Sequence, residues 1–485
     1  MYGGTKVAGF NQTAVGAMRT TNREGHIAYK MEDKENLVTK VLTTFFGEPK
    51  FYGDTDKELL ELASKLEPEF VVDLAVFARH EFHMRSVTHA LTAVLAHRVD
   101  AKHLVRELVN RVVVRADDMT EILAAYLVMF GKPIPNSLKK GIGDAFKRFD
   151  EYALAKYKGK RDKLKMRDVL CICHPKPKND EQSALWKRLI AGELATPDTW
   201  ETELSAKGNT KEVWEGLLER DAVGYMAMLR NMRNIINAQP SNIQLMYAKI
   251  ADTEQVRKSR QFPFAFLSAY KELQQVPNAS SKAFFALEKA MDASVVNLPK
   301  IPGRTCIAVD VSGSMTSAIS SRSKMTCAEI AVLLGVMAGQ ICEDSIFVTF
   351  DTGLYPQAVT PGSLLMQTRN ICVNGGGTDI SLPFKYLMQH RLEVDRVILL
   401  SDNMVNCGTG GKTVQSFADE YRSKMNNSLW VHAVDLQGYG TQQFIGNRTN
   451  IIAGWSEKLL EFILLAEEGM GSLVKRIEDY RVVGN

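Results

Sequence analysis

The sequence predicts a multidomain protein in which an all-helical region over residues 1–300 precedes an α/β domain over residues 301–485. Apolar residues recur at three- and four-residue spacing from about residue 32 to residue 293, which is the pattern of amphipathic helices. The stretch "NLPKIPGRT" then brings two prolines and a glycine, and apolar strands alternate with helices after it. The length of 485 residues agrees with this division, because a single domain usually holds roughly 100 to 200 residues.

The first region shows its helical period most clearly in four segments. The spacing predicts helices over residues 68–81, 86–97, 102–113 and 119–130. A dozen or more helices joined by short turns favour stacked helical pairs of the HEAT type. The sequence has no clean repeat period, so a compact helical bundle remains the alternative.

The second region alternates strands with helices. It predicts strands at "TCIAVDVS", "SIFVTFD", "DRVILLSD" and "LWVHAVD". Helices are expected at "SKMTCAEIAVLLGVMAGQIC" and near residues 413–425 and 456–467. Continuous apolar strands of this kind form a doubly wound, mostly parallel sheet that is covered on both faces. Ligands of such sheets bind beyond the carboxyl ends of the strands, so the residues there are the informative ones.

The amino-acid composition limits the class of protein to which this chain can belong. Hydrophobic residues make up 45% and charged residues 24%, the balance of a folded soluble chain. The seven cysteines stand mostly in apolar stretches, which predicts buried, reduced thiols and no disulfide framework. We find neither the apolar core of a secretory signal nor a membrane-spanning stretch. A cytoplasmic protein without membrane attachment is the expectation.

Hydroxyl and carboxylate side chains gather in three loops at predicted strand ends. The candidate metal ligands are Asp310, Ser312 and Ser314 in "DVSGS", Thr378 in "GGGTD", and Asp402 in "SD". Hard oxygen ligands with no histidine or cysteine nearby predict an octahedral divalent cation, Mg²⁺. Protein side chains alone would leave that cation underliganded. The alternative is that these side chains only cap the starts of helices.

These loops resemble the metal-ion-dependent adhesion site (MIDAS) of the von Willebrand factor A-type domain, an Asp-x-Ser-x-Ser loop with a later Thr and Asp. By this resemblance Ser312, Ser314 and Thr378 would bind the metal directly, whereas Asp310 and Asp402 would act mainly through water. The resemblance further implies that the ion accepts a carboxylate from an acidic residue of a protein partner.

A basic segment from Lys156 to Lys178 is the other candidate site. It holds nine lysines and arginines and two acids, a local net charge of 9 − 2 = +7, whereas the whole chain sums to only +4. This concentration predicts RNA or DNA binding, and a solvated helix face is the alternative. His174 follows an apolar helix and either contacts nucleic acid or only caps the last carbonyls. The basic residues are Lys156, Lys158, Lys160, Arg161, Lys163, Lys165, Arg167, Lys176 and Lys178.

Taken whole, the chain resembles the Ro autoantigen ribonucleoproteins and their bacterial relatives, which carry a TROVE helical-repeat module before an A-type domain. The resemblance is carried by "TNREGHIAYKM", "TTFFGEPKFYGD", "RDVLCICHPKP" and "AMLRNMRNI". It implies helical repeats bent into a ring that the A-type domain closes. Small structured Y RNAs would bind the basic outer surface, at positions 156–161 and His174, and single-stranded 3′ ends of misfolded RNAs would enter the central hole.

Further arginines are weaker candidates for the central hole. Arg230 and Arg233 lie three residues apart on one predicted helix, although Arg230 can equally pair with a neighbouring helix. Arg85, Arg106 and Arg115 are of the same kind.

The favoured function is that of a non-enzymatic, monomeric RNA-binding protein in RNA quality control or the stress response. The alternative is a protein-interaction scaffold that uses its metal site to capture an acidic residue of a partner. An enzyme is not expected, because no nucleophile, base and oxyanion donor can be grouped. An aspartyl-phosphate enzyme would need a second acid where Ser312 stands, and "GGGTD" lacks the Lys-Ser/Thr of a phosphate-binding loop.

Overall fold

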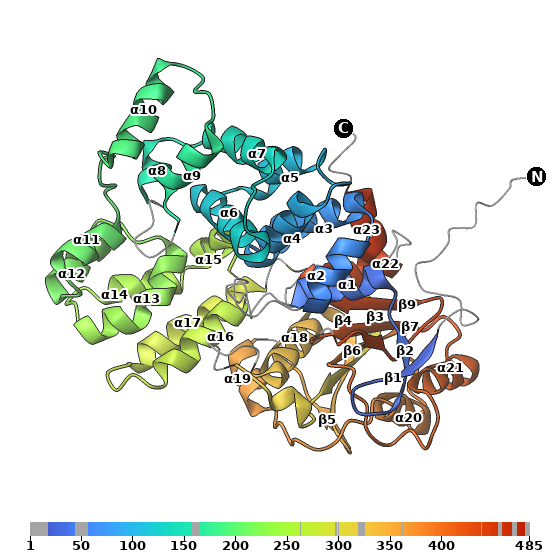
Figure 1. Cartoon of the computed structure of the whole chain (residues 1–485). Helices are drawn as coiled ribbons and strands as arrows, with labels where there is room; N and C mark the ends of the chain where they lie inside the picture. Colours follow the sequence, from blue (N-terminus) through green and yellow to red (C-terminus); the bar gives the residue numbers. More distant parts are fainter. Residues whose placement is uncertain are drawn as a thin grey trace, which may run out of the picture. The chain divides into compact units, whose positions relative to one another are not determined.

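The computed structural model contains two compact units (Figure 1). One consists of residues 32–198 and 474–485, and we call it the helical unit; the other consists of residues 1–31 and 199–473, and we call it the mixed unit. The structure describes residues 18–43, 57–156, 164–261, 263–295, 298, 300–318, 325–360, 362–437, 439–453, 458–467 and 473–480.

The helical unit is built from helices that pack on their neighbours along the chain. The helices are α1 (Asp33–Thr43), α2 (Lys57–Lys65), α3 (Pro68–His80), α4 (Ser86–His97), α5 (Val105–Val112), α6 (Ala116–Phe130), α7 (Asn136–Phe146), α8 (Glu151–Lys156), α9 (Met166–Cys173) and α10 (Asp180–Ala191). Helix α2 packs on α4, α3 on α5, α4 on α6, and α5 on α7. Contacts between next-but-one helices are typical of helical repeats, in which each unit touches only its neighbours.

The four helices expected from periodicity are present. Pro68 opens α3 in the first turn, where its missing N–H costs no hydrogen bond. Helix α4 buries ten consecutive residues from Val87 to Ala96, which explains why its apolar pattern extends around the whole helix.

The last helix, α23 (Leu473–Asp479), belongs largely to the helical unit, although the sequence placed it with the α/β domain. Lys34 of α1 donates to Glu478 at 2.9 Å, and the rings of Phe77 and Tyr480 pack edge to face with centroids 5.5 Å apart. Secondary structure changes from helix to strand at residue 301, whereas the compact units do not follow that boundary.

The mixed unit combines seven helices of the first region with the α/β fold. These helices are α11 (Trp200–Lys207), α12 (Lys211–Glu219), α13 (Tyr225–Ala238), α14 (Gln244–Ile250), α15 (Thr253–Ser259), α16 (Pro263–Leu273) and α17 (Ser281–Ser294). The helices that follow in the chain are α18 (Cys327–Ile341), α19 (Leu364–Asn370), α20 (Leu382–Gln389), α21 (Val414–Lys424) and α22 (Lys458–Glu467).

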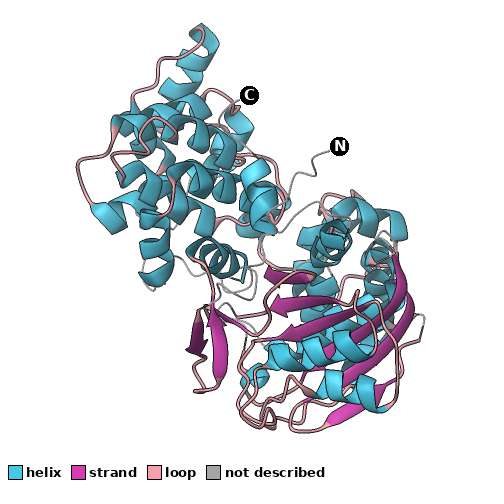
Figure 2. Cartoon of the chain, turned by 90° about the vertical axis from the view of Figure 1, so that its right-hand side faces the viewer, coloured by secondary structure: helices cyan, strands magenta, loops and turns pink. Residues whose placement is uncertain are grey.

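The main sheet has six strands in the order β5-β4-β3-β6-β7-β9. Its strands are β3 (Ile301–Asp310), β4 (Cys342–Phe350), β5 (Leu354–Gln357), β6 (Arg396–Ser401), β7 (Trp430–Asp435) and β9 (Thr449–Ala453). All neighbours pair in parallel except β4 and β5. Helices lie on both faces of this sheet (Figure 2), and the uniform burial of β6 explains its unbroken apolar sequence.

A second, antiparallel sheet was not anticipated from the sequence. It joins the short hairpin β1 (Arg19–Thr21) and β2 (Ile27–Lys30) to β8 (Thr441–Gln442). Two strands of three and four residues carry too little alternating pattern to be recognised, and their partner lies more than 400 residues away.

Two expectations from the composition can be compared with the structure. All seven cysteines are free, but only Cys306 and Cys327 are buried, and Cys171 and Cys372 are exposed, so the expected burial is wrong for several of them. Among the described residues, no helix has both the length and the apolar character needed to cross a membrane.

Candidate metal centre and nucleic-acid interface

The three candidate metal loops meet at the carboxyl end of the main sheet. Strands β3 and β6 are parallel neighbours, with Val309 opposite Leu400, so Asp310 and Ser401 leave the sheet side by side. Ser401 Oγ donates to Asp310 Oδ2 at 2.6 Å. The glycine-rich loop joins them because Gly313 N–H donates to the Gly376 carbonyl at 2.8 Å.

Most of the candidate ligands are buried at this edge. Asp310, Ser312, Thr378 and Asp402 are at most 1% exposed, whereas Ser314 is exposed. The hydroxyl oxygens of Ser312 and Ser314 are 3.3 Å apart. Thus one exposed hydroxyl lies beside a buried one, at the edge of the sheet where the buried carboxylates also lie.

Hydrogen bonds satisfy Asp310 more fully than Asp402. Asp310 accepts from the N–H of Ser312 through Oδ1, in addition to the Ser401 hydroxyl. Asp402 Oδ1 accepts from Met404 N–H at 3.1 Å, but its Oδ2 is buried without a hydrogen-bond partner in the part of the chain that the structure describes. A buried, unsatisfied carboxylate oxygen is costly and calls for an external partner.

No basic side chain within the described ranges forms an ion pair with Asp310 or Asp402. Burial, and then the charge of Asp402, raise the pKa of Asp310 to about 7. Burial also raises the pKa of Asp402, against the effect of the nearby Ser314 side chain. The charge of this pair therefore needs a proton or a cation, and the hard oxygens fit a divalent ion such as Mg²⁺.

Two residues that support the site were not among the predicted ligands. Ser401 holds Asp310, and Asn406 Oδ1 accepts the N–H of Thr378 at 2.7 Å. Ser401 directly precedes Asp402 at the strand end and was therefore within reach of the sequence argument, whereas nothing local marks Asn406. Across the described chain no cluster of three or more His, Cys, Asp or Glu side chains could hold a metal, so a site here depends on serine and threonine hydroxyls.

The basic segment is described in part. Lys158, Lys160, Arg161 and Lys163 lie outside the described residues. Lys156 is exposed at the end of α8, with its Nζ 5.8 Å from the ring centroid of Tyr152. The remaining residues of the segment are exposed on and beside α9: Lys165, Arg167, His174, Lys176 and Lys178. Together with Lys156, we call these residues the basic surface.

His174 turns the chain at the end of α9. It has a left-handed backbone with φ of 46°, and its N–H donates to the Leu170 carbonyl at 3.0 Å. The next residue, Pro175, lies against α7, where a Cβ added to Gly143 would be 3.2 Å from the Pro175 Cβ. Backbone geometry thus caps the helix and leaves the imidazole exposed to solvent.

The arginines proposed for a central hole divide into paired and unpaired ones. Arg230 is exposed and forms no ion pair with any described residue, whereas Arg233 pairs with Glu272 at 3.4 Å. Arg106 pairs with Asp144. The last two, Arg85 and Arg115, belong to a cluster around two aspartates.

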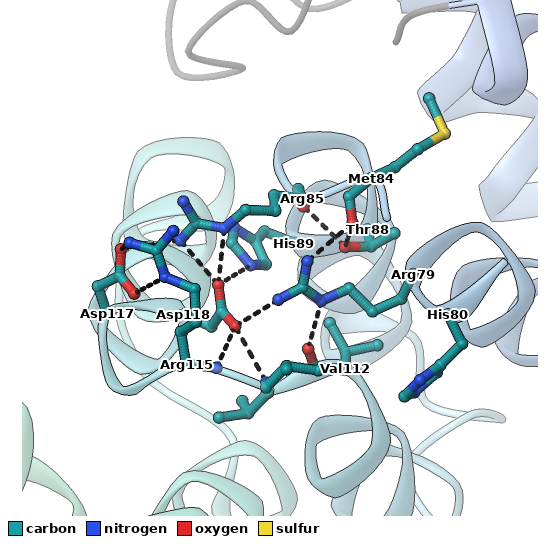
Figure 3. Close-up of polar contacts among 12 residues, drawn as sticks. Arg79, His80, Met84, Arg85, Thr88, His89, Val112, Arg115, Asp117 and Asp118 are labelled. Carbon is teal, nitrogen blue, oxygen red and sulfur yellow. Dashed lines mark hydrogen bonds and ion pairs between the residues drawn. The ribbon is translucent and has the colours of Figure 1, made fainter. Parts of the chain in front are cut away.

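That cluster is centred on Asp118 of α6 (Figure 3). Its Oδ2 accepts from Arg79 at 2.8 Å, and its Oδ1 accepts from Arg85 at 2.8 Å and lies 3.1 Å from His89 Nε2. The adjacent Asp117 accepts from Arg85 and Arg115, each at 2.9 Å. These guanidinium groups are neutralised within the fold, so they connect helices and are poor candidates for RNA contacts.

Comparison with known proteins identifies both regions. The TROVE domain family matches residues 21–191 and 181–285, more than half of the chain, and the Ro60 vWA domain family matches residues 304–442. The crystal structure of the Deinococcus radiodurans RO (RSR) protein aligns with a TM-score of 0.65 at 18% identity, over 89% of this chain and 100% of that one.

Curated relatives share parts of the sequence. Telomerase protein component 1 of Rattus norvegicus is 25% identical over 304 residues, which are 45% of this chain and 12% of the relative. The RNA-binding protein RO60 of Caenorhabditis elegans is 30% identical over 210 residues, 40% of this chain and 32% of the relative. The Deinococcus radiodurans RO60 is 24% identical over 347 residues, 61% of this chain and 65% of the relative.

The two RO60 relatives are named as RNA-binding proteins. The order of a TROVE domain and a Ro60 vWA domain agrees with the observed helices followed by an α/β fold. The chain therefore belongs to the Ro60 family of TROVE-domain proteins.

Proposed function

We propose that this protein binds a small structured noncoding RNA of the Y RNA type on its basic surface. The observation that carries the proposal is the exposure of that surface in a chain whose family includes proteins named for RNA binding. Lys165, Lys176 and Lys178 form no ion pair with any residue in the described ranges, so their charges are available to phosphate groups.

The chemistry of such a surface sets the mode of recognition. Lysine and arginine contacts to phosphates give affinity that tolerates sequence and falls with salt, whereas RNA shape and unpaired ends give selectivity. We further propose that single-stranded 3′ ends of misfolded RNAs enter a central hole of the helical repeats, where Arg230 is a candidate contact. This activity would serve RNA quality control or the stress response, with the protein acting as a monomer.

The test compares two double variants of equal charge. Lys176→Ala/Lys178→Ala removes two basic-surface charges, and Lys282→Ala/Lys289→Ala removes two exposed lysines of α17 as the control. Affinity for a synthetic RNA stem-loop with a single-stranded 3′ tail is measured by fluorescence anisotropy at KCl concentrations from about 50 to about 200 mM. The slope of log affinity against log salt concentration is then compared between the variants.

The basic-surface variant should lose affinity and reduce the log-log salt slope by about 0.7 to 0.9 for each lost phosphate contact. The control should keep the wild-type slope. Equal slopes for the wild type and both variants would refute the assignment of these lysines. His174→Ala is then expected to weaken binding with a smaller change of the salt slope than the double lysine variant, because it removes no lysine charge.

A second activity is favoured by the unsatisfied Asp402 Oδ2. We propose that Ser312, Ser314 and Thr378 bind a divalent cation such as Mg²⁺, while Asp310 and Asp402 hold it through water. The cation would supply a Lewis-acidic position to which a carboxylate of an acidic protein partner can bind. This site serves protein interaction beside RNA binding, and it requires no catalysis.

Calorimetric titration with Mn²⁺, a spectroscopically useful substitute for Mg²⁺, tests this second activity. The wild type should bind one equivalent, and Asp402→Asn should abolish binding, with Asp395→Asn at the opposite end of β6 as the control. Retention of wild-type affinity by Asp402→Asn would refute the site.

A further inference from the structure

An exposed tyrosine lies at the start of the basic segment. Tyr152 of α8 is 50% exposed and stands four residues before Lys156, the first lysine of that segment. Four residues make slightly more than one helical turn, so the two side chains lie on the same face of α8. The Lys156 Nζ is 5.8 Å from the centroid of the Tyr152 ring, within the range of a cation–π contact. This face of α8 therefore presents an aromatic ring and a cation together.

Tyr152 differs from the two other tyrosines that are exposed in the described part of the chain. Tyr355 donates its hydroxyl to Asp351 Oδ1 at 3.2 Å. Tyr480 lies 3.4 Å from Glu81 Oε1 through its hydroxyl oxygen and donates to it. The hydroxyl of Tyr152 forms no hydrogen bond with any residue that the structure describes. Contacts within the fold thus account for the positions of the other two rings, whereas the ring of Tyr152 stands beside a lysine.

Short as it is, helix α8 is held firmly in the helical unit. Asp150 Oδ1 accepts the N–H of Ala153 at 2.8 Å and so satisfies the first turn. Glu151 Oε2 accepts from Arg188 of α10 at 2.7 Å, and the side chain of Leu154 is fully buried. A tyrosine on such a helix has few conformations to lose when a ligand binds, which favours affinity.

Helix α10 connects this ring to the lysines of the basic surface. Both α8 and α9 pack on α10 (Figure 1). Gln182 of α10 accepts the N–H of Lys178 at 2.9 Å and donates to the Lys147 carbonyl at 3.2 Å. Gln182 and Arg188, which hold Lys178 and α8, are six residues or about 9 Å apart along the helix. The ring and the lysines are therefore close enough to contact one RNA molecule.

We propose that the ring of Tyr152 stacks on an unpaired base of the bound RNA while Lys156 contacts a neighbouring phosphate. This inference rests on the function proposed above and names the part of the RNA that the surface recognises. Base faces inside a stem are covered by neighbouring bases, whereas an unpaired base offers its face to an aromatic side chain. Proteins hold single-stranded nucleic acid with this combination of an aromatic ring and basic groups.

Stacking and charge leave different signatures in a binding measurement. A ring adds affinity for the base but releases no counterions, so its loss leaves the salt slope unchanged. A lysine that contacts a phosphate contributes to the slope whether or not a base is attached to the sugar. The roles of Tyr152 and Lys156 can therefore be measured separately.

The experiment uses the full chain and two synthetic RNAs of equal length in a fluorescence anisotropy titration. Both RNAs carry the same stem and the same single-stranded 3′ tail, but in one of them every unpaired nucleotide is abasic. The abasic RNA keeps the phosphates and lacks the bases that could stack. The variants are Tyr152→Ala, Tyr152→Phe and Lys156→Ala.

Phe285→Ala is the matched control. Phe285 of α17 is 66% exposed and has Lys289 four residues later, so it repeats the aromatic and lysine spacing outside the basic surface. This variant should bind both RNAs like the wild type.

Tyr152→Ala should lower affinity for the intact RNA about 5- to 150-fold without a change of salt slope. Its affinity for the abasic RNA should equal that of the wild type, which also shows that the variant is folded. Tyr152→Phe retains the ring and should bind both RNAs like the wild type. Lys156→Ala should weaken binding of both RNAs and reduce the salt slope.

Three results would overturn the inference. Tyr152→Ala could bind the intact RNA like the wild type, or it could lose the same factor in affinity for both RNAs. Tyr152→Phe could lose as much affinity as Tyr152→Ala, in which case the hydroxyl and not the ring carries the contact. If any of these occurs while Lys176→Ala/Lys178→Ala loses affinity, the RNA-binding proposal stands without the stacking. If the wild type binds neither RNA, the proposal and the inference fall together.

Discussion

Two cationic regions of the helical unit differ in where their charges are neutralised. The arginines around Asp118 are paired with carboxylates inside the fold (Figure 3). The side chain of Arg79 is only 6% exposed. The lysines of the basic surface are exposed, and Lys165, Lys176 and Lys178 have no ion pair in the described part of the chain. Charge balanced by the protein stabilises the fold, whereas charge left without a partner is available to a ligand.

The carboxyl end of the main sheet, like the basic surface, carries charged side chains that no described residue of opposite charge pairs with. Asp310 and Asp402 are as buried as Asp118, yet no described basic side chain pairs with them. The pKa of Asp118 is lowered, and the pKa values of Asp310 and Asp402 are raised. Three buried aspartates thus divide into one with a structural role and two that are suited to bind a cation.

The largest effect that tests this comparison is the loss of Asp118. Asp118→Asn should reduce the free energy of unfolding of the helical unit by about 3–5 kcal/mol, because Arg79 would remain buried without its anion. Urea unfolding followed by circular dichroism measures the change. Asp117→Asn is the control and should cost about 1 kcal/mol or less, since that ion pair is partly exposed. Equal losses in both variants would contradict the role assigned to Asp118.

Acid titration gives a second, smaller effect. Burial favours the neutral form of Asp118, but the hydrogen bond and charge of His89 and the charges of Arg79 and Arg85 outweigh it, and the pKa falls well below its ordinary 3.8. The stabilisation is therefore complete above about pH 5 and is lost as the pH falls toward the lowered pKa. The difference in unfolding free energy between the wild type and Asp118→Asn should shrink by up to about 1.4 kcal/mol per pH unit below that point.

Glu35 of α1 supplies a control of opposite sign. Burial raises its pKa from 4.5 to about 7, so its contribution is present at low pH and is lost as the pH rises through 7. Glu35→Gln should remove this loss. These assignments would be contradicted if the free energy of unfolding changed with pH in the same way in the wild type and in Asp118→Asn at acid pH, and in the wild type and in Glu35→Gln up to about pH 7.

The smallest expected effect concerns an exposed ion pair. Arg106→Ala breaks the contact with Asp144, and because Arg106 is 57% exposed the cost should be about 0–1 kcal/mol. RNA affinity should stay at the wild-type level, whereas Lys178→Ala on the basic surface should lower it without loss of stability. A clear loss of RNA affinity in Arg106→Ala would show that paired arginines also bind RNA.

Much of the fold could be predicted from the local sequence, because the helical spacing of apolar residues and the apolar runs indicate which residues are buried. The strand that ends at Asp310 and the strand that ends before Asp402 were expected, and the parallel topology brought their ends together. The contacts of Asn22 with Val405 and of Asn406 with Thr378 could not be foreseen, since they join residues distant in sequence through single hydrogen bonds. Pairing of Arg85 with Asp118, 33 residues away, likewise has no local signal.

The presence of RNA on the purified protein tests the central claim most directly. Wild-type protein and the Lys176→Ala/Lys178→Ala variant are isolated from the native host, and the RNA that accompanies each is sequenced. The account predicts one or a few small structured RNAs on the wild type and their loss from the variant. Wild-type protein free of RNA, or the same RNA in equal amount on the variant, would contradict it.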